Sequence, residues 1–380
     1  MNYPSTTFFR TSVALVLLLE ICAVNMFSAD PSGSSNFVER PLTGVWSAAS
    51  PMEYERYWFT ATTLLNGRVL VTGGYSYEYY DLKTAELFDG ATSSWRETGS
   101  MRFARYSHTA TLLADGRVLV AAGYNGDDMS SAEIYDPARR RWSTTGSLNV
   151  AREEHAATRL QDGRVLVVGG YTSQVGSTPS TEIYDPATGS WTVQGNLHDG
   201  RWWPTATTLD DGRVLVTGGV GVAVSNLATC ELFNPATGTW SQTGNLHVGR
   251  YAHTATLLSN GGVLVVGGHS GNYAPTNTAE IYDPATGVWT VVGNMHSGRA
   301  RHTAARLADG RVLVAGGWNV QVIPGAEIFD ATTSTWSATG RLITGRDEHS
   351  SAVLPDGRVL VAGGLDRNTQ ELESAEVFTP

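Results

Sequence analysis

Seven arginines recur at equivalent positions along the chain, and their type and spacing make them the first candidates for chemistry. They are Arg56, Arg105, Arg152, Arg201, Arg250, Arg299 and Arg346. Seven glutamates recur in the same rhythm, at Glu86, Glu133, Glu182, Glu231, Glu280, Glu327 and Glu376. A ring of guanidinium groups could clasp the carboxylates or phosphates of a ligand. Alternatively, each arginine pairs with a glutamate or with backbone carbonyls, because a buried charge needs a partner.

Aromatic residues break the pattern after two of these arginines. Arg56 is followed by Tyr57 and Trp58, and Arg201 by Trp202 and Trp203. A residue present in every copy of a repeat serves the scaffold, whereas one that departs from the pattern is a candidate for function. Flat aromatic faces suit sugar rings, apolar peptide side chains or quaternary ammonium groups, although extra packing is the alternative. The predicted ligand-binding residues are therefore Arg56, Tyr57, Trp58, Arg105, Arg152, Arg201, Trp202, Trp203, Arg250, Arg299 and Arg346.

Five histidines stand three residues after the other arginines, at His108, His155, His253, His302 and His349. Imidazole groups around one axis could suggest a metal. Their regular placement at the start of an expected strand instead indicates hydrogen-bonded structural residues. Equivalent positions in a ring also lie too far apart for most of them to share one ion. We predict neither a metal site nor a cofactor.

The elements that position these residues form an internal repeat. The string "GRVLV" or its variant begins at Gly67, Gly116, Gly163, Gly212, Gly261, Gly310 and Gly357. In the fifth copy, strand-like runs cover residues 253–259, 262–268, 279–283 and 288–293, and we call them A, B, C and D. Strand B is apolar on both faces and is expected to be buried on both. Units of four strands repeating every 47 or 49 residues are typical of a propeller blade.

The repeat resembles the kelch family. Its marks are a glycine pair, then an aromatic residue, then a tryptophan, here Gly267-Gly268, Tyr282 and Trp289. The resemblance covers residues 44–380 and implies an all-β, seven-bladed propeller of four antiparallel strands per blade. The chain enters with a strand D around Trp46 and ends with a strand C, so the N-terminal strand is expected to close the last blade.

In the kelch family the D-to-A loops, which here hold the arginines, border the ligand-binding face. The B-to-C loops open on the same face and vary in length here. They include the tyrosine-rich residues 75–84 and the segment 269–278. Loops that differ on a uniform scaffold commonly set binding specificity. These features favour a binding module for a glycan or a protein at the channel mouth.

An enzyme of the kelch type is the alternative. The "R-x-x-x-T-A-T-L-x-D-G-R-V" stretch resembles the propeller of galactose oxidase and glyoxal oxidase, which bind copper through tyrosines and histidines. In that family "R-W-Y" carries a tyrosine cross-linked to a cysteine, but here Trp58 and Trp203 stand at that position. Cys230 falls in an expected strand C, away from the mouth. A periplasmic sialic acid mutarotase, which has six blades, is a second relative whose acidic sugar would suit the arginines. We favour a binding module over an enzyme and keep the enzyme as the alternative.

The N-terminus bears on location. Arg10 precedes a short apolar run at residues 13–24, which resembles an export signal although Glu20 interrupts it. We expect residues 1–29 to be an export signal or membrane anchor and residues 30–43 a linker. The protein is then periplasmic, secreted or at the cell surface, monomeric, and in contact with a membrane only through an uncleaved N-terminus. A net charge of −10 argues against nucleic acid as a partner.

Overall fold

The computed structural model describes residues 44–222 and 224–380, and the structural statements below refer to these residues. The predicted export signal or anchor (residues 1–29) and linker (residues 30–43) lie outside them. Residues 44–222 and 224–380 belong to one compact unit. Among the described residues, no helix has the length and apolar character needed to cross a membrane.

Four types of strand make up the compact unit. The A strands are β2 (Thr60–Thr63), β8 (Thr109–Leu112), β12 (Ala156–Arg159), β18 (Thr205–Thr208), β22 (Thr254–Leu257), β28 (Thr303–Arg306) and β34 (Ser350–Val353). The B strands are β3 (Val69–Thr72), β9 (Val118–Ala121), β13 (Val165–Val168), β19 (Val214–Thr217), β23 (Val263–Val266), β29 (Val312–Ala315) and β35 (Val359–Ala362). We number the blades 1 to 7 by these strands, so that β2 begins blade 1 and β34 begins blade 7.

The outer half of each blade contains strands C and D. The C strands are β6 (Ala85–Asp89), β10 (Ala132–Asp136), β16 (Thr181–Asp185), β20 (Cys230–Asn234), β26 (Ala279–Asp283), β32 (Ala326–Asp330) and β36 (Ala375–Thr379). The D strands are β7 (Ser94–Glu97), β11 (Arg141–Thr144), β17 (Ser190–Val193), β21 (Thr239–Gln242), β27 (Val288–Val292), β33 (Thr335–Ala338) and β1 (Val45–Ala49).

Four B-to-C loops contain a short hairpin. The hairpins are β4 (Tyr75–Ser76) with β5 (Tyr80–Asp81), β14 (Tyr171–Thr172) with β15 (Gly176–Ser177), β24 (His269–Ser270) with β25 (Ala274–Pro275), and β30 (Trp318–Asn319) with β31 (Gln321–Val322). Each B-to-C loop lies beside the D-to-A loop of its own blade. Isolated bridges join Tyr57 to Tyr75 and Trp202 to Val220, for example. The expectation that both kinds of loop open on one face is confirmed.

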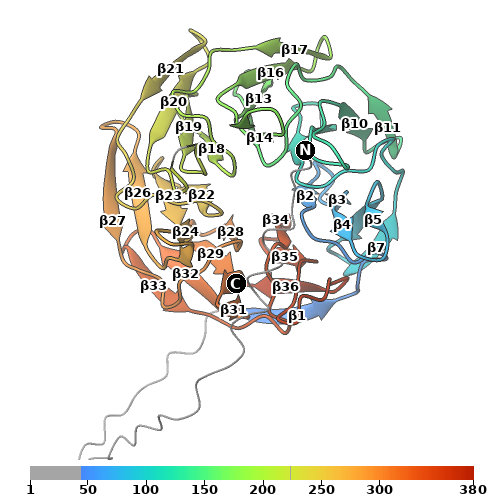
Figure 1. Ribbon diagram of the computed structural model, residues 1–380. Helices are drawn as coiled ribbons and strands as arrows, with labels where there is room; N and C mark the ends of the chain where they lie inside the picture. The colour runs from blue at the N-terminus through green and yellow to red at the C-terminus, as the bar shows by residue number, and fades with distance from the viewer. Residues whose placement is uncertain (1–43, 223) are drawn as a thin grey trace, which may run out of the picture. The chain divides into compact units, whose positions relative to one another are not determined.

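The blades form a closed ring. Seven antiparallel sheets of four strands stand around one axis, with the A strands innermost (Figure 1). Each A strand contacts the A strands of the two neighbouring blades. The predicted seven-bladed, all-β propeller is therefore confirmed.

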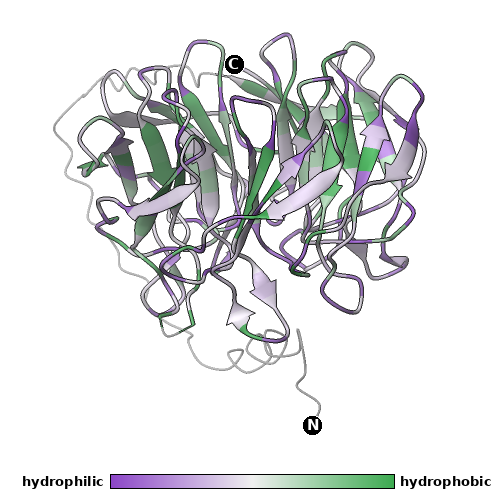
Figure 2. Ribbon diagram, turned by 90° about the horizontal axis from the view of Figure 1, so that it is seen from above, coloured by the Kyte–Doolittle hydropathy of each residue, from purple (hydrophilic) through white to green (hydrophobic). Residues whose placement is uncertain are grey.

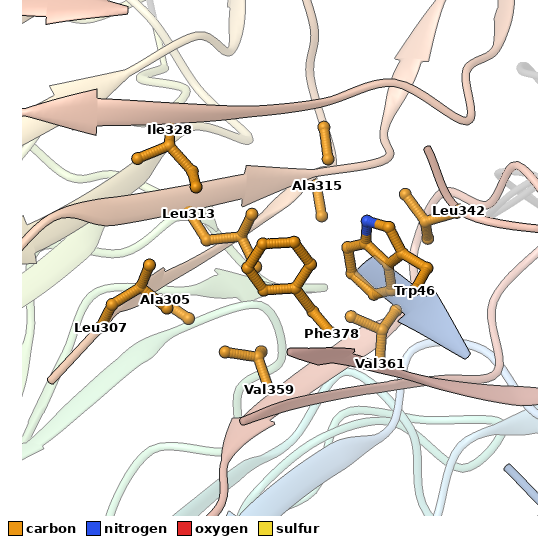
Figure 3. Close-up of a cluster of buried hydrophobic side chains, with 11 residues drawn as sticks. Trp46, Ala305, Leu307, Leu313, Ala315, Ile328, Leu342, Val359, Val361 and Phe378 are labelled. Atoms are coloured by element: carbon orange, nitrogen blue, oxygen red, sulfur yellow. The ribbon is translucent and has the colours of Figure 1, made fainter. Parts of the chain in front are cut away.

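The last blade is closed by the first strand, as predicted. Strand β1 pairs with β36 in antiparallel register from Val45 opposite Thr379 to Ala49 opposite Ala375. Trp46 packs on Phe378 with ring centroids 5.1 Å apart (Figure 3). The indole N–H of Trp46 donates a hydrogen bond of 2.8 Å to the carbonyl of Gly340. The two ends of the unit therefore share one sheet and one hydrophobic cluster.

Apolar layers between neighbouring blades hold the ring together. The B strands are buried along their whole length, and apolar runs mark the interiors of the sheets in Figure 2. The kelch signature residues contribute here, since Tyr282 packs on Trp289 at 5.1 Å, and the indole of Trp289 bonds the carbonyl of Gly244 in the preceding blade. Burial of apolar surface on this scale is the main stabilising contribution.

Candidate binding site at the channel mouth

The residues two positions after the seven arginines form a ring around the mouth of the channel. They are Trp58, Ser107, Glu154, Trp203, Ala252, Arg301 and Glu348, and we call them the mouth ring. All seven have φ between 51° and 56°, in the left-handed region. The N–H of Trp203 donates to the carbonyl of Glu154 at 2.9 Å, and four other links of the ring have the same form. Five of the seven junctions between blades are thus joined by a backbone hydrogen bond at the channel mouth.

The arginines brace the loops that carry this ring. Arg250 is fully buried, and its guanidinium bonds Glu280 at 2.8 Å and the carbonyls of Gly267 at 2.7 Å and Thr278 at 3.1 Å. The other six arginines make equivalent pairs at 2.8–3.1 Å. Burial raises the pKa of Glu280, but hydrogen bonds from His247 and the charge of Arg250 outweigh it and leave the pKa below its usual value.

The prediction that the arginines contact a ligand does not fit this geometry. Arg56, Arg105, Arg152, Arg201, Arg250, Arg299 and Arg346 have side chains at most 1% exposed. Their guanidinium groups are bonded to glutamates and carbonyls inside the protein and present no free face to a ligand. The alternative interpretation, in which arginine and glutamate pair, accounts for all seven. A repeated charged residue is more easily satisfied by a repeated partner than by one ligand.

The five histidines join neighbouring blades. Nε2 of His302 lies 3.0 Å from the hydroxyl of Thr254 in the preceding blade, and His253 lies 3.2 Å from Thr205. Burial lowers the pKa of His253 to about 3, with the charge of Arg250 adding to the effect, so this imidazole is neutral. Among the residues that the structure describes, no group of three metal-ligating side chains occurs.

One wall of the mouth is a stack of aromatic rings from blades 4 and 5. Trp202 and Trp203 have ring centroids 4.7 Å apart, and Trp203 and Tyr251 lie 5.4 Å apart with planes within 8° of parallel. We call these three residues the tryptophan stack. His269 continues it at 4.9 Å from Tyr251, and Trp318 follows at 5.8 Å. Both tryptophans of the stack are half-buried, so part of each ring faces solvent.

A second aromatic group comes from blades 1 and 2. Trp58 stacks on Tyr106 at 5.5 Å and contacts Tyr57 at 4.7 Å. Tyr57 is only 5% exposed and packs beneath Trp58 and the ring of Tyr75, so it supports the wall more than it faces a ligand. Trp58 is half-buried, like Trp203. Trp58 and Trp203 therefore lie in blades 1 and 4 of the seven, as the repeat predicts.

Four carboxylates at the mouth were missed in the sequence. Asp347 and Glu348 in blade 7 lie beside Arg301, whose guanidinium is 2.8 Å from Glu348 and 3.7 Å from Asp347. Glu153 and Glu154 occupy the matching positions in blade 3. Burial, with the nearby charge of Asp128, raises the pKa of Glu153 to about 8. The strings "REEH" (residues 152–155) and "RDEH" (residues 346–349) depart from the "RYAH" of residues 250–253. Departure from the repeat is the same criterion that identified the tryptophans.

The fold and the mouth define a β-propeller with one aromatic and acidic face. The profile of the KLHDC2/KLHL20/DRC7 Kelch-repeats domain matches residues 154–364, and that of the Kelch motif matches residues 105–149. The chain belongs to the kelch-repeat family. No curated protein matches it.

Many solved structures resemble the propeller. One is described as a novel fungal alcohol oxidase with catalytic diversity among the AA5 family, in complex with copper. It shares 16% sequence identity with this chain at a TM-score of 0.71, over 89% of this chain and 76% of the oxidase. An identity this low shows a common fold alone.

Among residues 44–222 and 224–380, no cysteine lies at the mouth to form a tyrosine–cysteine pair like that of the copper oxidases. Trp58 and Trp203 occupy the mouth-ring positions that match this tyrosine. Cys230 lies in β20, is 1% exposed, and packs in the hydrophobic cluster with Leu246 and Val265. Burial raises the pKa of the Cys230 thiol to about 12, so it is an unreactive core residue.

Proposed function

We propose that this kelch propeller is a binding module that holds a protein or glycan ligand at the channel mouth. The observation that carries the proposal is the tryptophan stack: two half-buried indoles and a tyrosine, set on the mouth ring of a rigid scaffold. Kelch propellers commonly act as binding modules. Exposed aromatic surface is expensive to maintain in water and is typical of ligand contacts.

The test is ligand capture by the full chain on glycan arrays and on arrays of displayed proteins. Wild type is compared with the Trp202→Ala, Trp203→Ala double variant and with Leu65→Ala as a control. Leu65 is 72% exposed in an A-to-B turn, at the opposite end of the blade from the mouth. We expect the double variant to lose the hits and the control to keep them.

Thermal melting separates binding from packing. The half-buried tryptophans predict a melting temperature close to that of wild type for the double variant. If binding persists in this variant, or if it melts far below wild type, the tryptophans are packing residues and the proposed site is incorrect.

A sugar-modifying enzyme is the weaker alternative. The mutarotase comparison relied on arginines that the structure places inside the blades. The comparison with the copper oxidases is weak because Trp58 and Trp203 stand where the oxidase tyrosine would be, and because Cys230 is buried in β20. Turnover of galactose or sialic acid by the full chain would support the enzyme alternative. An oxidase would in addition contain copper in stoichiometric amount.

We propose in addition that the protein is exported as a monomer. The support is the apolar run at residues 13–24 behind Arg10. Cell fractionation with N-terminal sequencing tests this: cleavage near residue 30 indicates a signal, and an intact N-terminus in a membrane fraction indicates an anchor. An intact chain in the cytoplasm would overturn the proposal.

A further inference from the structure

The β4–β5 hairpin of blade 1 presents tyrosine rings to solvent. Tyr77, Tyr79 and Tyr80 are exposed by 46%, 45% and 66%, and we call these three residues the tyrosine patch. Among the described residues, Tyr80 has no aromatic ring against it, and Tyr79 contacts only the ring of Tyr54, edge to face at 5.3 Å. Rings this exposed keep surface open to a ligand, unlike the rings of the tryptophan stack, which lie against one another.

Hydrogen bonds hold this hairpin in one shape. The hydroxyl of Ser76 donates to Glu55 at 2.8 Å and accepts from the N–H of Tyr79 at 3.3 Å. The N–H of Tyr77 donates to the carboxylate of Glu371, in the B-to-C loop of blade 7, at 2.9 Å. A loop fixed to both of its neighbours loses little conformational freedom when it binds a partner.

Backbone strain distinguishes Tyr80 from an ordinary surface residue. Its φ of 59° lies in the left-handed region, which is costly for a bulky L-residue. The matching position in the hairpin of blade 3 is Gly176, which has a φ of 74° without that cost. A large exposed side chain therefore stands where glycine would fit the backbone better. Strain of this kind gathers at ligand-binding sites.

Carboxylates surround the tyrosine patch. The B-to-C loops of blades 7 and 1 contain five acidic and two basic residues, whereas those of blades 3 to 6 contain no Asp, Glu, Lys or Arg. A hydrogen bond to Glu78 raises the pKa of the Tyr79 hydroxyl. Partial burial raises the pKa of Glu371, the N–H of Tyr77 lowers it, and the charge of Glu55 raises it again. Glu55 and Glu371 are thus close enough to repel each other, and a cation beside them would relieve this repulsion.

The basic side chains nearby leave this surface acidic. The buried Arg56 acts with its charge on Glu55, but its guanidinium is bonded to Glu86 at 2.8 Å. Lys83 and Arg367 are the two basic residues of the loops, and both are exposed. Neither forms an ion pair within residues 44–222 and 224–380. Acidic residues outnumber them, so the surface is complementary to a basic one.

We infer that the tyrosine patch binds an arginine-rich segment of a protein partner, with guanidinium groups on the rings of Tyr79 and Tyr80 and beside Glu78. Guanidinium groups stack on tyrosine faces and pair with carboxylates, and tyrosine is enriched at protein interfaces. The inference goes beyond the proposed function, because it adds a second contact surface on blades 7 and 1 that does not use the tryptophan stack.

Labelled peptides test the inference in solution. Ten-residue peptides of glycine and serine carry three arginines, three lysines or three citrullines, and fluorescence anisotropy reports binding to the full chain. Citrulline keeps the planar shape of arginine without its charge. We expect the arginine peptide to bind about ten-fold more tightly than the citrulline peptide and about three-fold more tightly than the lysine peptide. Raising the salt concentration from about 50 to about 300 mM should weaken binding of the arginine peptide, because the charges are exposed.

Tyr80→Gly separates binding from folding. Glycine relieves the left-handed strain, so this variant should melt no lower than wild type, while its affinity for the arginine peptide should fall about five-fold. Tyr273→Gly is the matched control and should keep wild-type affinity. Tyr273 is also left-handed, with a φ of 63°, and 58% exposed, but it lies in the uncharged B-to-C loop of blade 5. Glu78→Gln should weaken binding of the arginine peptide about three-fold and leave the citrulline peptide unchanged.

Three results overturn the inference: no binding of the arginine peptide to wild type, equal binding of the arginine and citrulline peptides, or undiminished arginine binding in Tyr80→Gly. Sedimentation of the full chain alone is a further check. A dimer that Tyr80→Gly dissociates would assign the patch to a second copy of this chain and would also overturn the inference.

The proposed function is tested separately. The Trp202→Ala, Trp203→Ala variant should bind the arginine peptide as wild type does, because the tyrosine patch lies on other blades. Loss of array hits in that variant supports the tryptophan stack whatever the peptides show, and loss of peptide binding in Tyr80→Gly supports the tyrosine patch whatever the arrays show.

Discussion

At the residue scale, the buried arginine–glutamate pair dominates each blade. Arg152 joins Glu182 at 3.0 Å, and both side chains are excluded from solvent. Glu182 also accepts from the backbone N–H groups of Asn149 and Val150, so the pair ties a D-to-A loop to strand C. Removing one partner of such a pair leaves an uncompensated charge in the interior.

Arg152→Ala should therefore destabilise the propeller by about 3–5 kcal/mol. Replacing both members with methionine should cost less than the single change, since no charge is left unpaired. Denaturant unfolding midpoints of the three proteins measure this. If Arg152→Ala abolishes ligand binding while leaving the unfolding midpoint unchanged, the arginine is a ligand contact after all.

The buried histidines predict a pH-dependent stability. Burial lowers the pKa of His253 to about 3, below its unfolded value, so its contribution is present above pH 6.5 and is lost as pH falls toward 3. His253→Phe copies Phe59, which stands at this position in blade 1. Its cost relative to wild type should be about 2 kcal/mol smaller at pH 5 than at pH 7.5. A cost that stays constant across this range would contradict the assignment.

The sequence predicted the scaffold residues better than the site residues. Arg, Glu and His recur in register, and the structural role of the histidines was predicted from this repetition. The seven arginines recur in the same way but were placed among the predicted ligand-binding residues, which their burial corrects. The site depends instead on single departures from the repeat, and only the tryptophans were recognised among them. Glu154 and Arg301 were missed, because a charge in a D-to-A loop looks like ordinary surface until the ring brings such loops together around one axis.

At the element scale, the mouth ring is a strained feature repeated in every blade. Non-glycine residues at φ near 52° are held there by hydrogen bonds from blade to blade. Left-handed backbone costs an L-residue about 1 kcal/mol, and glycine avoids this cost. The repeat conserves the conformation while leaving the side chain free to vary, and this freedom allows the site to differ between blades.

Ala252→Gly should accordingly stabilise the protein, or at least be neutral, by relieving up to about 1 kcal/mol of strain. Ala255→Gly, in strand β22 of the same blade, is the matched control and should destabilise by roughly 0.5–1 kcal/mol. Unfolding midpoints of both variants give the answer. Equal destabilisation by the two changes would show that the mouth ring stores no strain.

The order of the strands was predicted from the repeat, because each copy carries the same strand-like runs, and the common face of the variable loops was predicted from the resemblance to the kelch family. The ring of hydrogen bonds at the mouth was not predicted. It joins residues about 47 or 49 positions apart in neighbouring blades, and no local pattern in the sequence encodes that pairing.

At the scale of the whole molecule, closure depends on one short strand. Strand β1 provides the outer edge of blade 7 and buries Trp46 against Phe378 and Leu342 (Figure 3). Without it, the blade that joins the two ends of the unit would have only three strands and an open edge. Stability of the entire ring is therefore coupled to a residue at its beginning.

Trp46→Ala should lower the unfolding free energy by about 3–5 kcal/mol, since it removes a large buried side chain and leaves a cavity. Trp46→Phe keeps part of the packing but loses the hydrogen bond to Gly340, so its unfolding free energy should lie between those of wild type and Trp46→Ala. Calorimetric melting of the three proteins tests this. A melting temperature unaffected by Trp46→Ala would mean that β1 does not close the ring.

The measurement that most directly tests the account is amide hydrogen exchange of the full chain with and without a ligand found on the arrays. A binding site at the channel mouth predicts slower exchange on ligand binding in residues 202–204 and 251–253 and in the B-to-C loops, with the A-to-B turns at the opposite face unchanged. Protection confined to the A-to-B turns or to the outer D strands would place the ligand elsewhere and contradict a binding site at the channel mouth.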